Sequence, residues 1–276
     1  MKKKGSFFGT IWGAFKFIFN AIKWLATKGW AIAKWVFSLV ESTQEDQKKA
    51  AIERSRPEIK ATCVPMNSID ASDGGLPDFE SRLYSGKSLI GLILGSRGSG
   101  KSVLGMRMLE NVVAKTGMKS YCMGFDRRRL PKWIEPVDSL DEVQNNSFLL
   151  VDEGGVEFSS RNSMSNANKL LSTLLFISRH KDINVLFISQ NSANIEVNAI
   201  RQSDYLLLKQ PSLLQLDFER KAIRDIYGRV KDKFKKHSGE KGLVYVYSDQ
   251  FRGFAANSLP SFWSENLGKS YRDKKG

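Results

Sequence analysis

The chain has 276 residues, of which 41% are hydrophobic and 26% are charged, and it carries a formal net charge of +14. This balance excludes a disordered chain, a collagen-like chain and a polytopic membrane protein, and the length allows one large or two small domains. Two cysteines, Cys63 and Cys122, and two histidines, His180 and His237, exclude a disulfide scaffold, a four-thiolate zinc site and a histidine-rich metal centre.

The positive charge is concentrated at the two ends of the chain. Residues 1–40 contain seven lysines and no acidic residue, and residues 209–276 contain fifteen Lys or Arg against eight Asp or Glu, so each end has a net charge of +7. The stretch between them is neutral, with 21 basic and 21 acidic residues. This distribution predicts a core flanked by segments that contact anionic lipid or nucleic acid, with tails that only aid solubility as the alternative.

Residues 1–40 predict a basic, aromatic-rich helix. Its longest uncharged run, Gly5 to Phe15, is shorter than the roughly 20 residues of a spanning helix. Four of the six tryptophans lie in this segment, and its polar residues recur along one narrow helical stripe: Lys16, Asn20, Lys23, Thr27 and Lys34. We therefore expect it to lie in the interface of an anionic membrane. A spanning helix, an oligomer that hides the lysines and a helix packed on the protein's own core remain alternatives.

Residues 41–87 change to a polar composition, which predicts a linker and a lead-in of a strand or two. The run Ser88 to Leu94 is a short apolar strand, and a helical pattern covers Val103 to Lys115. Between them lies G-x-x-x-x-G-K-S, the Walker A motif, in the strand–loop–helix context that this motif requires. This phosphate-binding loop, called the P-loop below, comprises Gly95, Ser96, Arg97, Gly98, Ser99, Gly100, Lys101 and Ser102. Its glycines let backbone N–H groups approach the phosphates of ATP, Lys101 neutralises the β and γ oxygens, and Ser102 is expected to bind Mg²⁺.

A second buried strand, Ser147 to Val151, ends in the acidic pair Asp152 and Glu153. Asp152 is the expected Mg²⁺ residue of Walker B, and Glu153 is the expected base that polarises the attacking water. The spacing from Lys101 leaves room for one strand, Lys119 to Phe125. This arrangement predicts an α/β fold of the RecA/ASCE-like P-loop NTPase class, in which a parallel sheet is flanked by helices, preceded here by the amino-terminal hydrophobic helix.

Further along the chain, a helix is predicted over Asn168 to His180 and strands over Ile183 to Gln190 and Ser203 to Lys209. Gln190 is the candidate sensor of the γ-phosphate, with an ordinary strand-end glutamine as the alternative. Three arginines are candidates for a finger that reaches the nucleotide of a neighbouring subunit: Arg161, Arg179 and Arg201.

The segments LLVDEGG, ISRHKDINVLFISQ and IRQSDYLLLKQPS resemble the ATPase domain of zonula occludens toxin-like proteins, the filamentous-phage assembly ATPases. That family belongs with the FtsK/HerA-type DNA-translocating and virus-packaging P-loop ATPases. The resemblance covers residues 88–210. It implies Lys101 and Ser102 as the Walker A pair and Asp152 and Glu153 as the Walker B pair. It also implies Arg179 as the arginine before the sensor strand and Gln190 as the sensor. In the phage proteins the membrane helix usually follows the ATPase domain, whereas here it precedes it. This difference argues against a role in phage extrusion and leaves DNA packaging and DNA transfer as equal alternatives.

The sequence therefore predicts four segments: a membrane-associating helix (1–40), a polar linker and lead-in (41–87), an ATPase core (88–210), and a basic helix, a hairpin and a tail (211–276). The expected function is a membrane-associated ATPase that uses ATP and Mg²⁺ to translocate or package DNA for a virus or mobile element. The expected partners are an anionic membrane, DNA of any sequence, further copies of the chain in a homo-oligomer such as a hexameric ring, and viral assembly or capsid proteins. The expected location is a host or virion membrane, with the ATPase domain on the cytoplasmic side. The alternatives are an ATPase for particle assembly or protein export without DNA contact, and a membrane-active toxin-like protein.

Overall fold

The computed structural model describes residues 47–153 and 163–264, together with Lys23, Trp24, Lys28, Trp30, Lys34, Trp35 and Thr43. The chain divides into two compact units, Met1–Ser55 and Arg56–Gly276. In the first unit, the described positions are helical, and the three tryptophans among them are exposed. The rest of the predicted helix of residues 1–40 lies outside the described residues. Among those that are described, no helix is long and apolar enough to cross a membrane.

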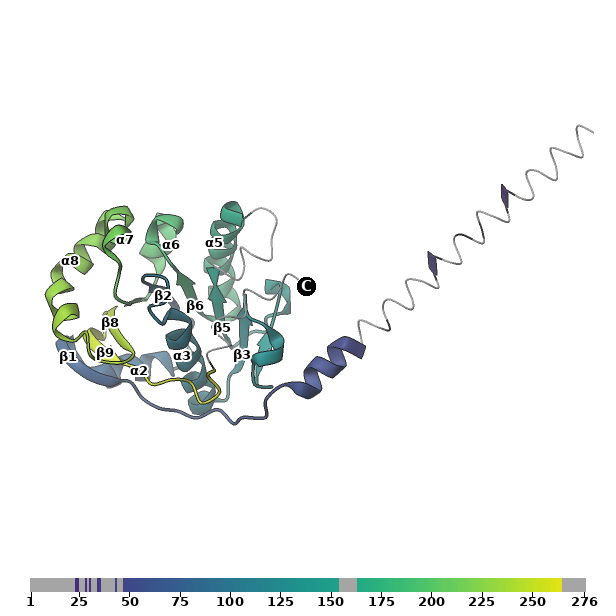
Figure 1. The fold of residues 1–276 in the computed structure, drawn as a ribbon, viewed down its shortest axis with the longest axis horizontal. Coiled ribbons are helices and arrows are strands. Elements are labelled where there is room, and N and C mark those ends of the chain that lie inside the picture. Colours follow the sequence, from purple (N-terminus) through teal and green to yellow (C-terminus); the bar gives the residue numbers. More distant parts are fainter. Residues whose placement is uncertain are drawn as a thin grey trace, which may run out of the picture. The chain divides into compact units, whose positions relative to one another are not determined.

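One nine-stranded sheet organises the described part of the second unit (Figure 1). The strands are β1 (Asn67–Gly74), β2 (Ile90–Leu94), β3 (Lys119–Met123), β4 (Ile134–Pro136), β5 (Ser147–Asp152), β6 (Asn184–Ser189), β7 (Tyr205–Leu208), β8 (Leu243–Ser248) and β9 (Phe251–Ala256). Their order across the sheet is β1-β9-β8-β7-β2-β6-β5-β3-β4. The six strands from β7 to β4 are parallel, and β8, β9 and β1 extend the sheet with antiparallel pairing. The predicted α/β fold is confirmed, and the sheet is mixed and mostly parallel where a parallel sheet was predicted.

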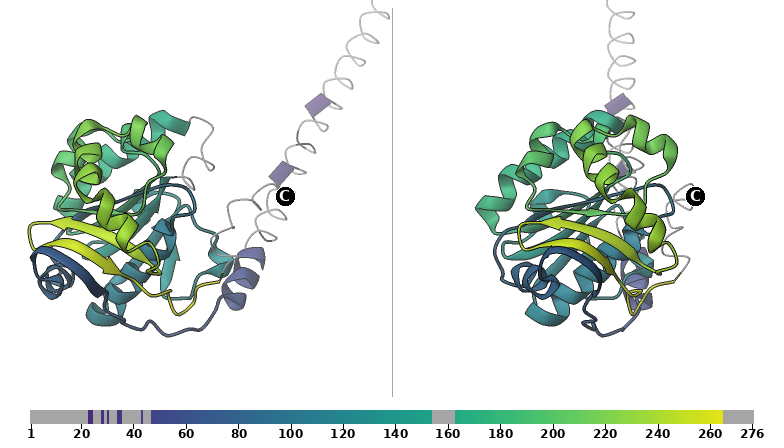
Figure 2. Two further views of the ribbon diagram at one scale, coloured as in Figure 1. Left: turned by 60° about the vertical axis from the view of Figure 1, so that its left-hand side comes forward. Right: turned by 90° about the vertical axis from the view of Figure 1, so that its left-hand side faces the viewer.

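The central strands are apolar because both faces of the sheet are covered by helices. The helices are α2 (Leu76–Leu83), α3 (Lys101–Thr116), α5 (Ser163–Lys181), α6 (Val197–Gln202), α7 (Leu213–Phe218) and α8 (Lys221–Lys236). Helices α2 and α3 cover one face, and α5 to α8 lie on the other (Figure 2). Each face has its own apolar cluster, so the sheet is a rigid platform with its loops at the two edges.

The parallel register defines which loops share an edge. Leu94 at the end of β2 pairs with Ser189 at the end of β6, and Val151 and Asp152 near the end of β5 pair with Phe187 and Ile188. The carboxyl ends of β2, β5 and β6 therefore meet at one edge, which is where open α/β sheets place their ligands.

Two predicted elements differ in the structure. The basic helix predicted within residues 211–276 is interrupted between α7 and α8 at Glu219 and Arg220. The Glu219 carboxylate accepts hydrogen bonds from the backbone N–H and hydroxyl of Ser192, and the Arg220 guanidinium donates to the carbonyls of Ser192 and Ile195. These tertiary contacts hold the chain in an extended conformation at the break. In the lead-in, one strand, β1, is followed by the helix α2, where only strands were expected.

Candidate functional site

The P-loop joins β2 to α3 at the carboxyl edge of the sheet. Gly95 has φ 150° and Gly100 has φ 86°, values that favour glycine. A Cβ atom on Gly95 would lie 2.7 Å from Cβ of Lys209, so the close packing of the loop on β7 also requires glycine there. The residue before α3 is Gly100, which has no side chain to cap the helix. The first N–H groups of that helix are therefore available for an anionic ligand.

Lys101, the first residue of α3, is buried and folds back across the P-loop. Its Nζ donates hydrogen bonds to the carbonyl oxygens of Gly95, at 2.7 Å, and Ser96, at 2.9 Å. Burial lowers the pKa of Lys101, and the negative charges of Asp152 and Glu153 oppose that effect. In this desolvated site the Lys101 ammonium group contacts only neutral carbonyls, so a negatively charged phosphate would stabilise it more strongly. The predicted phosphate-binding role fits this geometry.

Ser102 and Asp152 lie together, as a Walker A and Walker B pair would. The Ser102 hydroxyl donates a 2.9 Å hydrogen bond to Oδ2 of Asp152, which is buried at the end of β5. Both side chains offer oxygen ligands, which suit Mg²⁺. Among the described residues, no group of three or more His, Cys, Asp or Glu could hold a metal ion by itself. These two residues fit a magnesium ion that takes its remaining ligands from substrate phosphates and water, as Mg²⁺ usually does in nucleotide sites.

Glu153 is 5% exposed and is held by the end of the neighbouring strand β6. Its Oε2 atom accepts a short hydrogen bond from the Ser189 hydroxyl and a 3.4 Å hydrogen bond from the backbone N–H of Gln190. The contact with Ser189 was not predicted, because a serine inside an apolar strand run carries no signal of its own. It fixes the position of the carboxylate that is the candidate base.

Gln190 is exposed at the same edge, one residue beyond β6. Its backbone carbonyl accepts a 2.7 Å hydrogen bond from the side chain of Gln215 on α7. The structure thus places Gln190 beside Glu153 through its main chain, and the sensor role of its side chain stays a prediction.

Arg179 lies at the opposite edge of the sheet from the P-loop. It is near the end of α5, which leads into the amino end of β6, and the adjacent Ser178 carbonyl accepts a hydrogen bond from Ser88, just before β2. Strands of five or six residues at about 3.3 Å each separate the two edges. Arg179 therefore does not share a site with the P-loop of its own chain. Arg201, at the end of α6 and before β7, lies at that same far edge; Arg161 lies outside the described residues.

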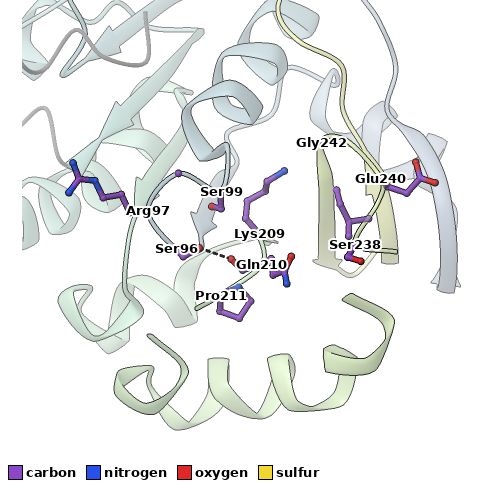
Figure 3. Close-up of a pocket in the computed structure, with 11 residues that line it drawn as sticks. Ser96, Arg97, Ser99, Lys209, Gln210, Pro211, Ser238, Glu240 and Gly242 are labelled. Carbon is purple, nitrogen blue, oxygen red and sulfur yellow. Dashed lines mark hydrogen bonds between the residues drawn. The ribbon is translucent and has the colours of Figure 1, made fainter. Parts of the chain in front are cut away.

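The P-loop is hydrogen-bonded to the segment that follows β7 (Figure 3). The Ser96 hydroxyl and backbone N–H both donate to the carbonyl of Gln210, at 3.0 Å and 3.4 Å. Next to this contact, Lys209 is 4% exposed, and burial lowers its pKa to about 8. Lys209 was not predicted as a site residue, since a lysine after a strand usually points to solvent. Arg97, at the tip of the P-loop, is exposed.

No protein-family model and no curated protein matches this chain. Several solved structures are similar to it. The DNA-packaging ATPase B204 of Sulfolobus turreted icosahedral virus is 15% identical with a TM-score of 0.45, over 63% of this chain and 99% of B204. The conjugation coupling protein TcpA of pCW3, solved with ATPγS, is 15% identical with a TM-score of 0.43, over 69% of this chain and 66% of TcpA.

The N-terminal domain of zonular occludens toxin from Neisseria meningitidis is 18% identical with a TM-score of 0.31, over 44% of this chain and 76% of that domain. Zonular occludens toxin, whose family the sequence motifs resemble, is thus among the proteins to which the structure is similar. At scores below 0.5 and identities below 20%, the function has to be judged from the chain's own site.

Proposed function

We propose that the chain is a membrane-associated, oligomeric P-loop ATPase that translocates or packages DNA. The observation that supports hydrolysis is the convergence of Lys101, Ser102, Asp152 and Glu153 at the carboxyl ends of β2, β5 and β6. They bring a phosphate-binding lysine, two oxygen ligands for a cation and a separate buried carboxylate to one place, which is the set that phosphoryl transfer to water needs.

Each residue has a distinct task in this proposal. Lys101 exchanges the carbonyls of Gly95 and Ser96 for the β and γ phosphate oxygens and neutralises their charge. Glu153, oriented by Ser189, accepts a hydrogen bond from the attacking water and takes its proton. Mg²⁺, when bound by Ser102 and Asp152, would supply electrostatic stabilisation of the phosphate oxygens.

The proposed DNA contact rests on helix α8, which is apolar on one face and basic on the other. Its buried stripe packs on the sheet: Ile223, Ile226, Tyr227, Val230 and Phe234. Its exposed basic residues, on the face turned away from that packing, include Arg229, Lys231, Lys235 and Lys236. A surface of this kind attracts phosphates of any sequence, as a motor that moves along DNA requires.

Lys233 differs from the other lysines of α8. Its Nζ forms a 2.9 Å ion pair with Asp70 on β1, and Nε2 of His237 lies 3.4 Å from the same carboxylate. Because this contact joins α8 to β1, Lys233 has a structural task, and the DNA contact is assigned to its exposed neighbours.

The membrane contact is proposed from residues 1–40, which carry +7 and four tryptophans. The described tryptophans in this segment, Trp24, Trp30 and Trp35, are 60–66% exposed, so a lipid interface is a favourable environment for their rings. The cytoplasmic orientation and viral assembly partners belong to the same proposal.

Oligomerisation is proposed from the position of Arg179. A finger arginine at the edge opposite its own P-loop can act only on the nucleotide of a neighbouring copy. An assembly such as a hexameric ring would bring the two edges of adjacent subunits together.

Steady-state ATP hydrolysis with and without DNA tests this function. We expect double-stranded DNA of unrelated sequences to raise the rate equally, and Lys101→Ala to abolish it. Hydrolysis that DNA leaves unchanged would favour particle assembly or protein export. Lysis of vesicles by the amino-terminal segment, with no hydrolysis by the chain, would favour the membrane-active alternative.

A further inference from the structure

Lys209 is a nearly buried lysine that has no counter-charge among the residues the structure describes. The residue is 4% exposed, and neither an ion pair nor a hydrogen bond of its ammonium group occurs among the described residues. Burial is the one cause that lowers its pKa, and Glu240, a carboxylate on the wall of the same cavity, forms no ion pair with it. An isolated buried cation is costly in free energy, so an anionic ligand that contacts the Lys209 ammonium group would be stabilising.

The side chain of Lys209 follows the P-loop. Its Cβ packs against Gly95, and its Cε lies 3.8 Å from the position that a Cβ of Gly100 would take, at the start of α3. The Ser99 hydroxyl, also at this side of the loop, is buried with no hydrogen-bond partner among the described residues. Two unsatisfied polar groups therefore flank the same stretch of the P-loop.

A cavity of about 420 Å³ opens beside these groups. Its walls are residues 96–99 of the P-loop, residues 209–211 after β7, and the segment between α8 and β8 (Figure 3). Figure 3 shows Lys209 between Ser99 and the segment that carries Gly242. The volume lies within the usual range for small-molecule sites.

The strand order indicates which end of a bound nucleotide would lie in the cavity. Strand β2 has β6 on one side and β7 on the other, and Glu153 lies on the β5–β6 side. The terminal phosphate of a bound nucleotide must lie near Glu153, so the rest of the nucleotide extends toward β7. Lys209 and the cavity are therefore at the nucleoside end.

We propose that Lys209 is a nucleotide-binding residue whose ammonium group contacts the phosphate nearest the nucleoside, and that the adjoining cavity holds the nucleoside. This inference rests on the proposed ATP binding and assigns a second cation to that site. ADP and ATP share this phosphate, so Lys209 contributes equally to the binding of both. The segment between α8 and β8 then forms part of the nucleotide site.

Lys209→Met in the full chain tests the proposal, because methionine keeps an unbranched stem beside Gly95 and removes the charge. Binding of ADP and of a non-hydrolysable ATP analogue would be measured by calorimetry, together with the melting temperature of the nucleotide-free protein. The matched control is Lys87→Met, an exposed lysine before β2 at the opposite edge of the sheet.

We expect Lys209→Met to weaken both nucleotides by about 10- to 100-fold, the usual effect of a hydrogen bond to a charged group. The nucleotide-free variant should melt at the same temperature as the wild type or higher, because an uncompensated buried charge is gone. Lys87→Met should change neither value.

Affinities within twofold of the wild type would overturn the proposal. So would a lower melting temperature of the nucleotide-free variant, which would assign Lys209 to support of the P-loop, or a loss confined to the ATP analogue, which would place Lys209 at the terminal phosphate. If the wild type binds neither nucleotide, the proposed function fails first, and this inference fails with it.

Discussion

Replacing Glu153 by glutamine removes the proposed base and preserves the shape of the site. Glutamine has nearly the same volume, and its amide oxygen can still accept the hydrogen bond from Ser189. Lys101, Ser102 and Asp152 keep their contacts, so nucleotide affinity should stay within about threefold of the wild type.

The expected loss in kcat is about 10²–10⁴-fold, the usual contribution of a general base, which corresponds to roughly 3–5 kcal/mol of transition-state stabilisation. Phosphate release under steady-state conditions measures the rate, and equilibrium binding of a fluorescent nucleotide measures the affinity. Hydrolysis by Glu153→Gln at the wild-type rate would refute the assignment of the base.

Ser189→Ala is the companion variant, because it keeps the Glu153 carboxylate and removes the hydroxyl that orients it, together with the contacts of that hydroxyl to the backbone of Asn191. A hydrogen bond to a charged group contributes ~1.5–3 kcal/mol, so this variant should lose roughly 12- to 160-fold in kcat. A larger loss in Ser189→Ala than in Glu153→Gln would show that the carboxylate is not the group that acts on water.

Three further predictions concern stability, DNA and lipid. Glu110→Ala removes the carboxylate that lies 3.1 Å from buried Arg107 and leaves that cation only the carbonyls of Thr62 and Leu259, so the unit should lose ~3–5 kcal/mol of stability and melt roughly 6–20 °C lower. Replacing Lys235 and Lys236 together by Gln should weaken DNA binding equally for unrelated sequences, and the slope of log affinity against log salt should fall by about two. Deleting residues 1–40 should abolish flotation with anionic vesicles and retain ATP binding.

Each of these has an outcome that contradicts it. A melting temperature of Glu110→Ala within 2 °C of the wild type would mean that the carbonyls of Thr62 and Leu259 are sufficient partners for Arg107. An unaltered salt slope would remove α8 from the DNA contact, and Lys233→Gln, in which the lost ammonium was paired with Asp70, should leave that slope largely unchanged. Full-length chain that stays at the bottom of the flotation gradient would exclude the interfacial helix.

The core of the candidate site could be predicted from sequence because its signals are local. The P-loop is a continuous motif between a strand and a helix, and Asp152 and Glu153 are marked by the apolar strand before them. A continuous motif specifies its own backbone conformation, so Lys101 and Ser102 are found where they were expected.

The parts that were missed depend on pairing between distant segments. Ser189 matters because β6 lies beside β5, and Lys209 matters because β7 lies beside β2. Likewise, the position of Arg179 at the far edge follows from the direction of α5, which spacing alone does not reveal. The break between α7 and α8 also has a distant cause, since Ser192 holds Glu219.

The most direct test of the account is a single-turnover experiment with the full chain in excess over radiolabelled ATP. Under these conditions even a slow intrinsic hydrolysis is visible without DNA, membrane or partner proteins. We predict release of the γ-phosphate that requires Mg²⁺ and is abolished in Lys101→Ala. ATP that stays intact with the wild type, or hydrolysis that proceeds equally in Lys101→Ala, would contradict the proposal that this P-loop is an ATPase site.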